Sequence, residues 1–299
     1  MKLLIFLAAG LVLSILCLAC KTKGPAMLGS AAPTIPNVKQ TDPAARLFFE
    51  RIEAENVEHL RLHFVLEVEN PRTVSADLDI QDWGIQINNQ PSNEGAYLIL
   101  DSNAPQVNAG ASARFPMRLD LDMNKLRLSK EEIVTEYLTE LQMYLRFAFE
   151  TGDTAITQIR TEAVFPRIEE PEFSITSIAV RRGEQVNTNT HFRVGLHIDN
   201  PNVFPLELSA LSYSFYGNGA FWADGQENIV LHIPAKGSTE TQVFLMINFI
   251  DISKNLKNQL ITLKRVQYRL TGETKILTNI VYLPEFSMDF DIFRNSDME

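Results

Sequence analysis

The stretch Phe64-Val-Leu-Glu-Val-Glu-Asn-Pro71 alternates apolar and polar side chains and ends in an Asn-Pro pair. A matching stretch, Val194-Gly-Leu-His-Ile-Asp-Asn-Pro201, follows at an offset of 130 residues. Alternation with a period of two is typical of a half-buried antiparallel strand. Proline lacks the backbone donor that a strand uses, so we expect each Asn-Pro pair to end its strand. Because Asn can also bond back to nearby backbone, we prefer a structural role for Asn70, Pro71, Asn200 and Pro201 over a recognition loop.

The similarity extends beyond this stretch and makes the chain an internal repeat. At the same offset Leu78 corresponds to Leu208, and further along the offset shrinks to 126, where Ala111 corresponds to Gly237. A unit of about 120 residues is too long for a solenoid repeat and has the size of a domain. We therefore predict a first domain over residues 46–168, a second over 169–293 and a tail over 294–299.

Each copy is predicted to be rich in short strands. Asn88-Asn89 and Gly217-Asn218-Gly219 accept the positive φ of hairpin turns. Ser129 to Glu132 resembles a capping box that opens a helix extending to about Leu145, and Ser253 to about Arg265 is its counterpart. Many strands and one late helix per copy predict a mostly β chain of two tandem antiparallel β-sandwiches, each with one short helix.

The N-terminus has the features of a targeting segment. Lys2 precedes an uncharged apolar run from Leu3 to Ala19, which is typical of a secretory signal. The run is near the lower length limit of a membrane span, so an uncleaved anchor is the alternative. The end of the run, Leu16-Cys17-Leu18-Ala19-Cys20, resembles a bacterial lipobox, with Cys17 where Leu is usual. We predict a lipoprotein signal peptide over residues 1–19 and a flexible tether over 20–45.

Lipid chains on Cys20 would attach the chain to a membrane, because two buried chains suffice for stable anchoring. Lys21 follows this cysteine, whereas an Asp there retains lipoproteins at the inner membrane of familiar diderm bacteria. The sequence therefore predicts a lipid-anchored protein of the bacterial cell envelope, with the outer membrane preferred.

Charge and cysteine content exclude several classes of protein. The 27 basic and 37 acidic residues give a formal charge of −10, which argues against a partner that is a nucleic acid. Cys17 and Cys20 are the two cysteines of the chain. After residue 20 the sequence therefore excludes an intrachain disulfide, a Cys-ligated zinc site and a Cys nucleophile.

The order of features in the second copy resembles a known family. A strand ends in Asn200-Pro201-Asn202, and a Leu-x-Leu pair, an aromatic strand and a Gly-containing hairpin follow. This resembles the WHy domain, the water-stress and hypersensitive-response domain of group-two late embryogenesis abundant proteins, across about residues 170–290. The first copy has Arg72 as its third motif residue. The resemblance implies fibronectin-like or immunoglobulin-like sandwiches, a link to desiccation and stress protection, no enzymatic activity and no cofactor.

Candidate sites for chemistry are few. Asp120, Asp122, Asn124 and Glu131 have the spacing of a calcium loop, but Lys125 stands where its tight turn needs Gly. We therefore expect these acids to lie along a strand, with no metal bound. The five histidines are expected on the surface. Phe221 and Trp222, near a hairpin tip, are the candidates for partner contact, although alternation places one of them in the core.

These observations together predict a non-enzymatic envelope lipoprotein with tandem stress-protection domains that binds or protects at the envelope. The alternative is a periplasmic carrier of a lipid or another apolar ligand. A continuous apolar cavity lined by inward side chains would distinguish the carrier. The sequence names no protein or lipid partner.

Overall fold

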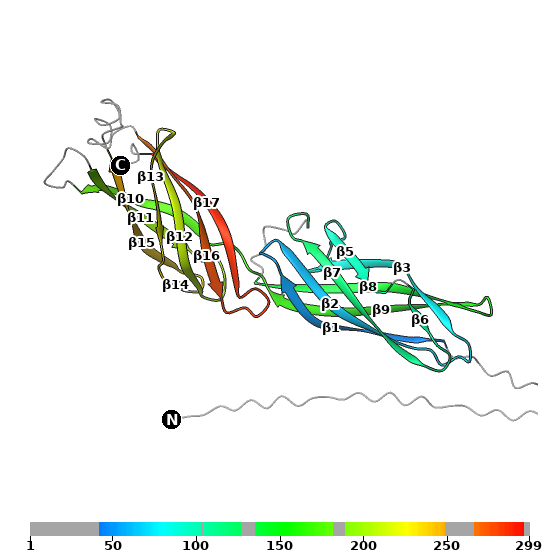
Figure 1. The fold of residues 1–299 in the computed structure, drawn as a ribbon. Helices are drawn as coiled ribbons and strands as arrows, with labels where there is room; N and C mark the ends of the chain where they lie inside the picture. Colours follow the sequence, from blue (N-terminus) through cyan, green and yellow to red (C-terminus); the bar gives the residue numbers. More distant parts are fainter. Residues whose placement is uncertain (1–41, 103, 127–134, 182–188, 249–265, 296–299) are drawn as a thin grey trace, which may run out of the picture. The chain divides into compact units, whose positions relative to one another are not determined.

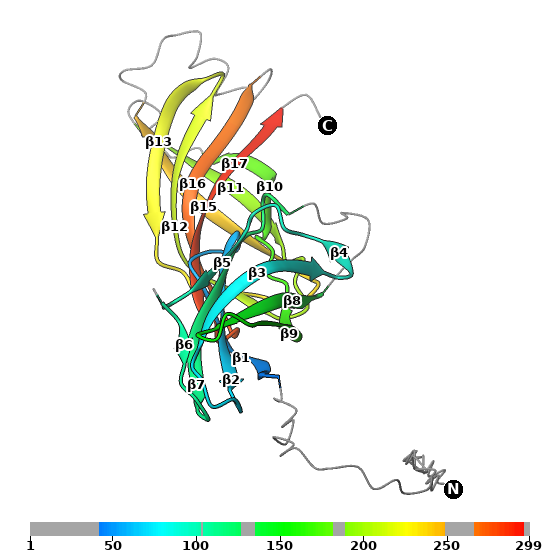
Figure 2. The ribbon, with the colours of Figure 1, turned by 90° about the vertical axis from the view of Figure 1, so that its right-hand side faces the viewer.

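The computed structural model describes residues 42–102, 104–126, 135–181, 189–248 and 266–295. Within these ranges every regular element is a β-strand, and the paired strands are antiparallel (Figures 1 and 2). The prediction of a mostly β chain is therefore confirmed. The signal peptide and most of the tether, residues 1–41, lie outside the described residues.

The first half contains two sheets. One has the order β1-β2-β7-β5, and the other has the order β4-β3-β8-β9 with β6 also paired to β3. Their strands are β1 (Ala44–Ala54), β2 (His59–Glu69), β3 (Ala76–Ile87), β4 (Gln90–Pro91), β5 (Ala96–Leu100), β6 (Gln106–Val107), β7 (Ser112–Asp122), β8 (Glu136–Phe149) and β9 (Thr154–Pro166).

The two sheets of the first half share one hydrophobic core, so their arrangement is sandwich-like. β2 contributes Leu62, Phe64 and Leu66, and β8 contributes Leu141 and Leu145, all fully buried. On β2 the residues between them are partly exposed. The alternation seen in the sequence thus separates a core face from a solvent face, as period-two side-chain geometry requires.

The second half repeats this plan with one sheet of order β10-β11-β15 and one of order β13-β12-β16-β17, where β14 also pairs with β12. Its core contains a cluster of aromatic rings from four strands: Phe192, Phe215, Trp222 and Tyr268. The strands are β10 (Glu172–Arg181), β11 (Asn189–Asp199), β12 (Leu206–Gly217), β13 (Ala220–Glu227), β14 (Leu231–Ile233), β15 (Ser238–Asn248), β16 (Gln267–Thr278) and β17 (Glu285–Asn295).

The helix expected from Ser129 to about Leu145 is wrong over its described part, which belongs to β8. Every second side chain of this strand is buried, from Tyr137 to Phe149. The segment also fits a helical period, but β8 bonds to β3 on one side and to β9 on the other. Tertiary pairing on both edges overrides local propensity here. The counterpart helix, Ser253 to about Arg265, lies outside the described residues.

Both predicted hairpin turns are present. Asn88 and Asn89 have φ of 50° and 63° between β3 and β4, and Asn218 and Gly219 have φ of 49° and 78° between β12 and β13. Two consecutive left-handed residues form the type I′ turn, whose twist matches that of the strands it joins.

Tyr282, in the loop between β16 and β17, contacts the first half of the chain. Its hydroxyl donates to the carbonyl of Pro166, its ring meets the ring of Phe165 edge to face with centroids 6.2 Å apart, and its carbonyl accepts from the Ala54 amide at 3.2 Å. Burial raises the pKa of the Tyr282 hydroxyl. These contacts lie within one compact unit, Gln40–Glu299. Whether each half folds independently, as the repeat predicts, stays a prediction.

Among the described residues no helix has the length and apolar character needed to span a membrane.

Candidate functional site

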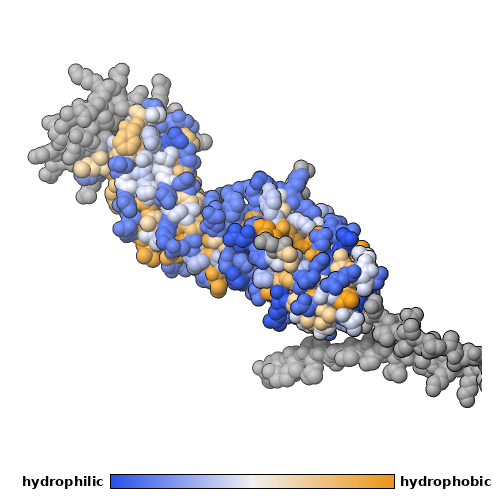
Figure 3. All heavy atoms as spheres, turned by 45° about the vertical axis from the view of Figure 1, so that its right-hand side comes forward, coloured by the Kyte–Doolittle hydropathy of each residue, from blue (hydrophilic) through white to orange (hydrophobic). Residues whose placement is uncertain are grey.

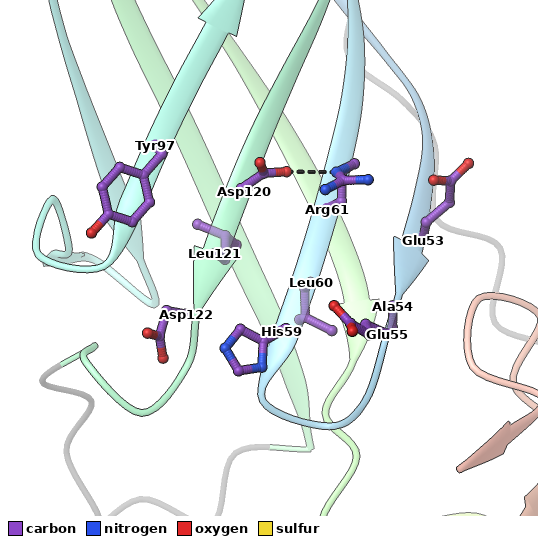
Figure 4. Close-up of a pocket in the computed structure, with 10 residues that line it drawn as sticks. All are labelled: Glu53, Ala54, Glu55, His59, Leu60, Arg61, Tyr97, Asp120, Leu121 and Asp122. Atoms are coloured by element: carbon purple, nitrogen blue, oxygen red, sulfur yellow. Dashed lines mark hydrogen bonds and ion pairs between the residues drawn. The ribbon is translucent and has the colours of Figure 1, made fainter.

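A cavity of about 490 Å³ opens at one end of the sheet β1-β2-β7-β5 (Figure 4). Arg61 of β2, Asp120 of β7 and Tyr97 of β5 stand side by side on three neighbouring strands, in one row of the register. The complete lining is Glu53, Ala54, Glu55, His59, Leu60, Arg61, Tyr97, Asp120, Leu121 and Asp122. The cavity is thus built mainly from polar side chains on the outer face of a sheet.

Several charged groups in and beside this cavity form ion pairs. Arg61 Nε donates to Asp120 Oδ1 at 2.6 Å, and Lys125 Nζ lies 2.7 Å from Asp122 Oδ2. His63 Nε2 lies 3.1 Å from Glu53 Oε2. The bond from Lys125 lowers the pKa of Asp122, and bonds from Arg51 and His63 lower the pKa of Glu53. A lowered pKa keeps a carboxyl charged at neutral pH, which suits an ion pair better than a proton donor.

The calcium spacing falls on β7 and the turn after it. Asp120 and Asp122 alternate with the buried Leu119 and Leu121, so both acids lie on the solvent face of a strand. Each carboxylate bonds to a cationic side chain, and Glu131 lies outside the described residues. Among the residues that the structure describes, no group of three or more His, Cys, Asp or Glu side chains could hold a metal ion.

The two Asn-Pro motifs begin one residue beyond the ends of β2 and β11, and the Asn of each binds carbonyls of the same two segments in its half. Asn200 Nδ2 donates to the carbonyls of Phe204, Ile233 and Pro234 at 2.9, 3.3 and 3.1 Å. In the first half, Asn70 Nδ2 donates to the corresponding carbonyls, those of Val74, Val107 and Asn108 at 2.8, 3.2 and 3.3 Å. Both side chains are buried. Each amide therefore joins the end of its strand to two separate segments, which is a structural task.

The third motif residue binds the segment that enters each half. Asn202 exchanges two hydrogen bonds of 2.8 Å with the backbone of Glu169, just before β10. In the first half Arg72 replaces it, and its guanidinium pairs with Asp42 at 2.9 Å, just before β1. The same guanidinium lies 3.9 Å from the ring centroid of Phe149. Two different side chains thus anchor corresponding segments.

The two candidates for partner contact, Phe221 and Trp222, lie in different environments. Trp222 is 6% exposed and packs in the aromatic core, whereas Phe221 is 57% exposed. Contact through Phe221 stays a prediction, and Trp222 is a core residue. On the face shown in Figure 3, hydrophilic residues cover much of the described surface with apolar patches between them. One exposed ring on such a surface does not by itself define a binding site.

The sequence does not predict this cavity as a site, although Asp120 and Asp122 are two of its candidate calcium ligands. Two of its ion pairs, Arg61–Asp120 and His63–Glu53, join β2 to β7 and β1 to β2, so they depend on strand register. No spacing within the sequence reveals that Arg61 lies opposite Asp120. Cys20, the predicted lipid acceptor, lies outside the described residues.

The fold defines a class: mostly β proteins with sandwich-like pairs of antiparallel sheets. Residues 195–289 match the family model described as Late embryogenesis abundant protein. This match supports a domain of that type in the second half, in agreement with the resemblance carried by Asn200-Pro201-Asn202.

Two solved structures show distant similarity to the chain. A protein from Archaeoglobus fulgidus is 19% identical, with a TM-score of 0.26 over 39% of this chain and 94% of its own. A protein from Arabidopsis thaliana, solved in solution, is 17% identical, with a TM-score of 0.35 over 44% of this chain and 83% of its own. Similarity at this level carries no argument about function. None of the curated proteins compared with the chain matches it.

Proposed function

We propose that the chain is a non-enzymatic lipoprotein of the bacterial cell envelope whose two late-embryogenesis-abundant-type domains bind or protect components of the envelope under water stress. The observation that carries the proposal is the family match over residues 195–289. The repeat supports the same domain type for the first half, where Asn70 bonds to the corresponding carbonyls. Both domains are proposed to have the fibronectin-like or immunoglobulin-like form of the β-sandwich.

The apolar run from Leu3 to Ala19, followed by Cys20, supports location at a membrane. A lipid on Cys20 would anchor the chain, and Lys21 favours the outer membrane. The predicted tether begins at Cys20, and its last two residues, Ala44 and Ala45, belong to β1. The part before β1 would hold the domains away from the bilayer, since a chain rich in Gly, Ala, Pro and Thr forms no core of its own.

The paired charges in the cavity support a binding or protecting role over catalysis. Asp120 bonds to Arg61 and Asp122 bonds to Lys125, so both acids already have cationic partners. The carrier of an apolar ligand remains the second hypothesis from the sequence. The described cores are lined by fully buried side chains from facing sheets, which supports packing over a continuous apolar cavity.

The proposal is tested with the host bacterium lacking this protein. Wild type, Cys20→Ala and the matched control Cys17→Ala are returned to it, and labelling by a clickable palmitate, recovery with membranes and survival of drying are measured. We expect Cys20→Ala to lose label, membrane recovery and survival, and Cys17→Ala to retain all three. Full labelling of Cys20→Ala would refute the lipoprotein, and equal survival with and without the protein would refute the protective role.

A further inference from the structure

The two halves differ in one strand pairing. In the first half the chain leaves the β3-β4 hairpin and crosses to the opposite sheet, where β5 covers the edge of β7. In the second half the corresponding segment stays on its own sheet as β13, paired with β12 over Leu211–Gly217. Among the described residues, β15, the counterpart of β7, therefore has a strand partner on one side, β11 (Figure 1).

The uncovered part of β15 corresponds to the part of β7 that β5 covers. The bonds of Asn70 to Ala111 and of Asn200 to Gly237 set the offset between β7 and β15 at 126 residues. β5 pairs with β7 over Met117–Leu121, which corresponds to residues 243–247. At the outward positions β7 has Arg118 and Asp120, whereas β15 has Phe244 and Met246.

These outward side chains make the edge of β15 apolar. Phe244 is 64% exposed and Met246 is 60% exposed. From Gln242 to Met246 the strand contains no charge and no proline. Natural proteins usually protect an edge strand with charged residues or proline, or cover it with another segment, because its unpaired backbone groups can bind other strands.

The backbone of β15 offers hydrogen bonds on this side. The Phe244 amide donates to Glu227 Oε1 at 3.4 Å, and the Phe244 carbonyl accepts from the Tyr213 hydroxyl at 3.3 Å. The amide and the carbonyl of Phe244 thus face away from β11. Because the direction of these backbone groups alternates along a strand, the amides and carbonyls of Gln242 and Met246 also face away from β11. The side chains of Glu227 and Tyr213 thus bond to the backbone of one residue of this edge, Phe244, and the backbone of an incoming strand could replace these two bonds.

We infer that the edge of β15 at Gln242–Met246 binds an extended, apolar segment of a partner protein, added antiparallel as a further strand. The chain itself shows the chemistry of the occupant, because at the corresponding edge β5 supplies Ala-Tyr-Leu-Ile-Leu, residues 96–100. Backbone bonds would provide affinity, and alternate side chains would contact Phe244 and Met246 and provide specificity. This inference goes beyond the proposed function and does not depend on lipid attachment.

The probe is a fluorescent peptide with the sequence of residues 94–101, Glu-Gly-Ala-Tyr-Leu-Ile-Leu-Asp, and its control carries Pro at the position of Leu98. Anisotropy is measured on titration with the full chain in detergent, with detergent alone as the blank. The variant Phe244→Lys places a charge on the edge, and Phe48→Lys on β1, another exposed aromatic residue of a sheet edge, is the matched control.

We expect saturable binding that Phe244→Lys weakens by about tenfold or more and that Phe48→Lys leaves within about twofold, since affinity of an added strand depends on its edge. The proline peptide should not bind. Circular dichroism melts check that both variants remain folded. If Phe244→Lys does not fold, Phe244→Thr replaces it in the titration. Absence of saturable binding, or equal binding by all variants, would overturn the inference. Self-association abolished by Phe244→Lys, without peptide binding, would instead assign the edge to a second copy of the chain.

Discussion

The side-chain amide of Asn202 donates a hydrogen bond of 2.9 Å to the side-chain carbonyl of Asn200, inside the loop that ends β11. Asn200 is thereby held while its own amide donates to three carbonyls. The first half has no such pair, because Arg72 takes the third motif position and contacts Asp42 and Phe149. The motif therefore combines a constant residue that joins loops with a variable residue that holds the incoming chain.

Asn200→Ala should lower the free energy of unfolding by about 2–3 kcal/mol, because it leaves buried carbonyls without a donor. The backbone amide of Asn202 would lose its acceptor, Asn200 Oδ1, as well. The exposed Asn108 is the matched control, and Asn108→Ala should change stability by less than about 0.5 kcal/mol. Denaturant melts of the full chain measure both. Equal stability of Asn200→Ala and the parent would refute the structural role of the motif.

Arg72→Ala should cost about 1–2 kcal/mol, since it removes a partly desolvated cation–π contact and an ion pair. Hydrogen exchange at the start of β1 should accelerate because Asp42 loses its partner. Arg114→Ala is the control: that guanidinium pairs with Glu67 in an exposed setting, so its loss should be nearly neutral. If the two variants have the same melting temperature, stacking on Phe149 contributes nothing.

Thr139→Val tests the strand assignment of β8. The Thr139 hydroxyl is buried and has no hydrogen-bond partner among the described residues. Replacing it with a methyl group of similar size removes an unsatisfied polar group, so stability should rise by about 0.5–1 kcal/mol. In the expected helix this position would lie off the apolar face of Tyr137 and Leu141, and Val would bring no gain. A clear loss of stability on thermal melting would contradict the strand environment.

Tyr268 makes folding sensitive to alkaline pH. Burial raises the pKa of its hydroxyl to about 12, whereas an unfolded chain has a Tyr pKa of about 10. The raised pKa contributes stability below pH 10 that is lost as pH rises toward 12, because the unfolded state ionises first.

Tyr268→Phe should therefore reduce the loss of stability between about pH 10 and pH 12. At neutral pH it should leave stability unchanged or higher, since the hydroxyl has no hydrogen-bond partner among the described residues. Chemical denaturation at pH 8, 10 and 11 measures this, with the exposed Tyr97→Phe as control. A pH profile of Tyr268→Phe that coincides with the parent would contradict the assignment. Burial also raises the pKa of Tyr213 and Tyr282, so part of the alkaline loss should remain.

Local sequence determined the strand class, the repeat and the turns. Leu62, Phe64 and Leu66 alternate with polar neighbours, and one face of the resulting strand is buried, because side-chain direction alternates whatever the strand pairs with. Asn218-Gly219 forms its hairpin for a similar reason, since left-handed φ is a property of those residues. The offsets between the copies follow from the sequence alone, and they agree with the equivalent hydrogen bonds made by Asn70 and Asn200.

Tertiary structure decided what local patterns left open. The segment from Tyr137 to Leu145 fits two periods, and pairing with β3 and β9 selected the strand. Register placed Arg61 beside Asp120 and formed the cavity, which no spacing along the chain encodes. Trp222 and Phe221 are adjacent, yet the first fills the core and the second meets solvent. The uncovered edge of β15 exists because β13 remains on β12 while β5 crosses to β7. Such choices depend on long-range backbone bonds, and local sequence carries little information about those bonds.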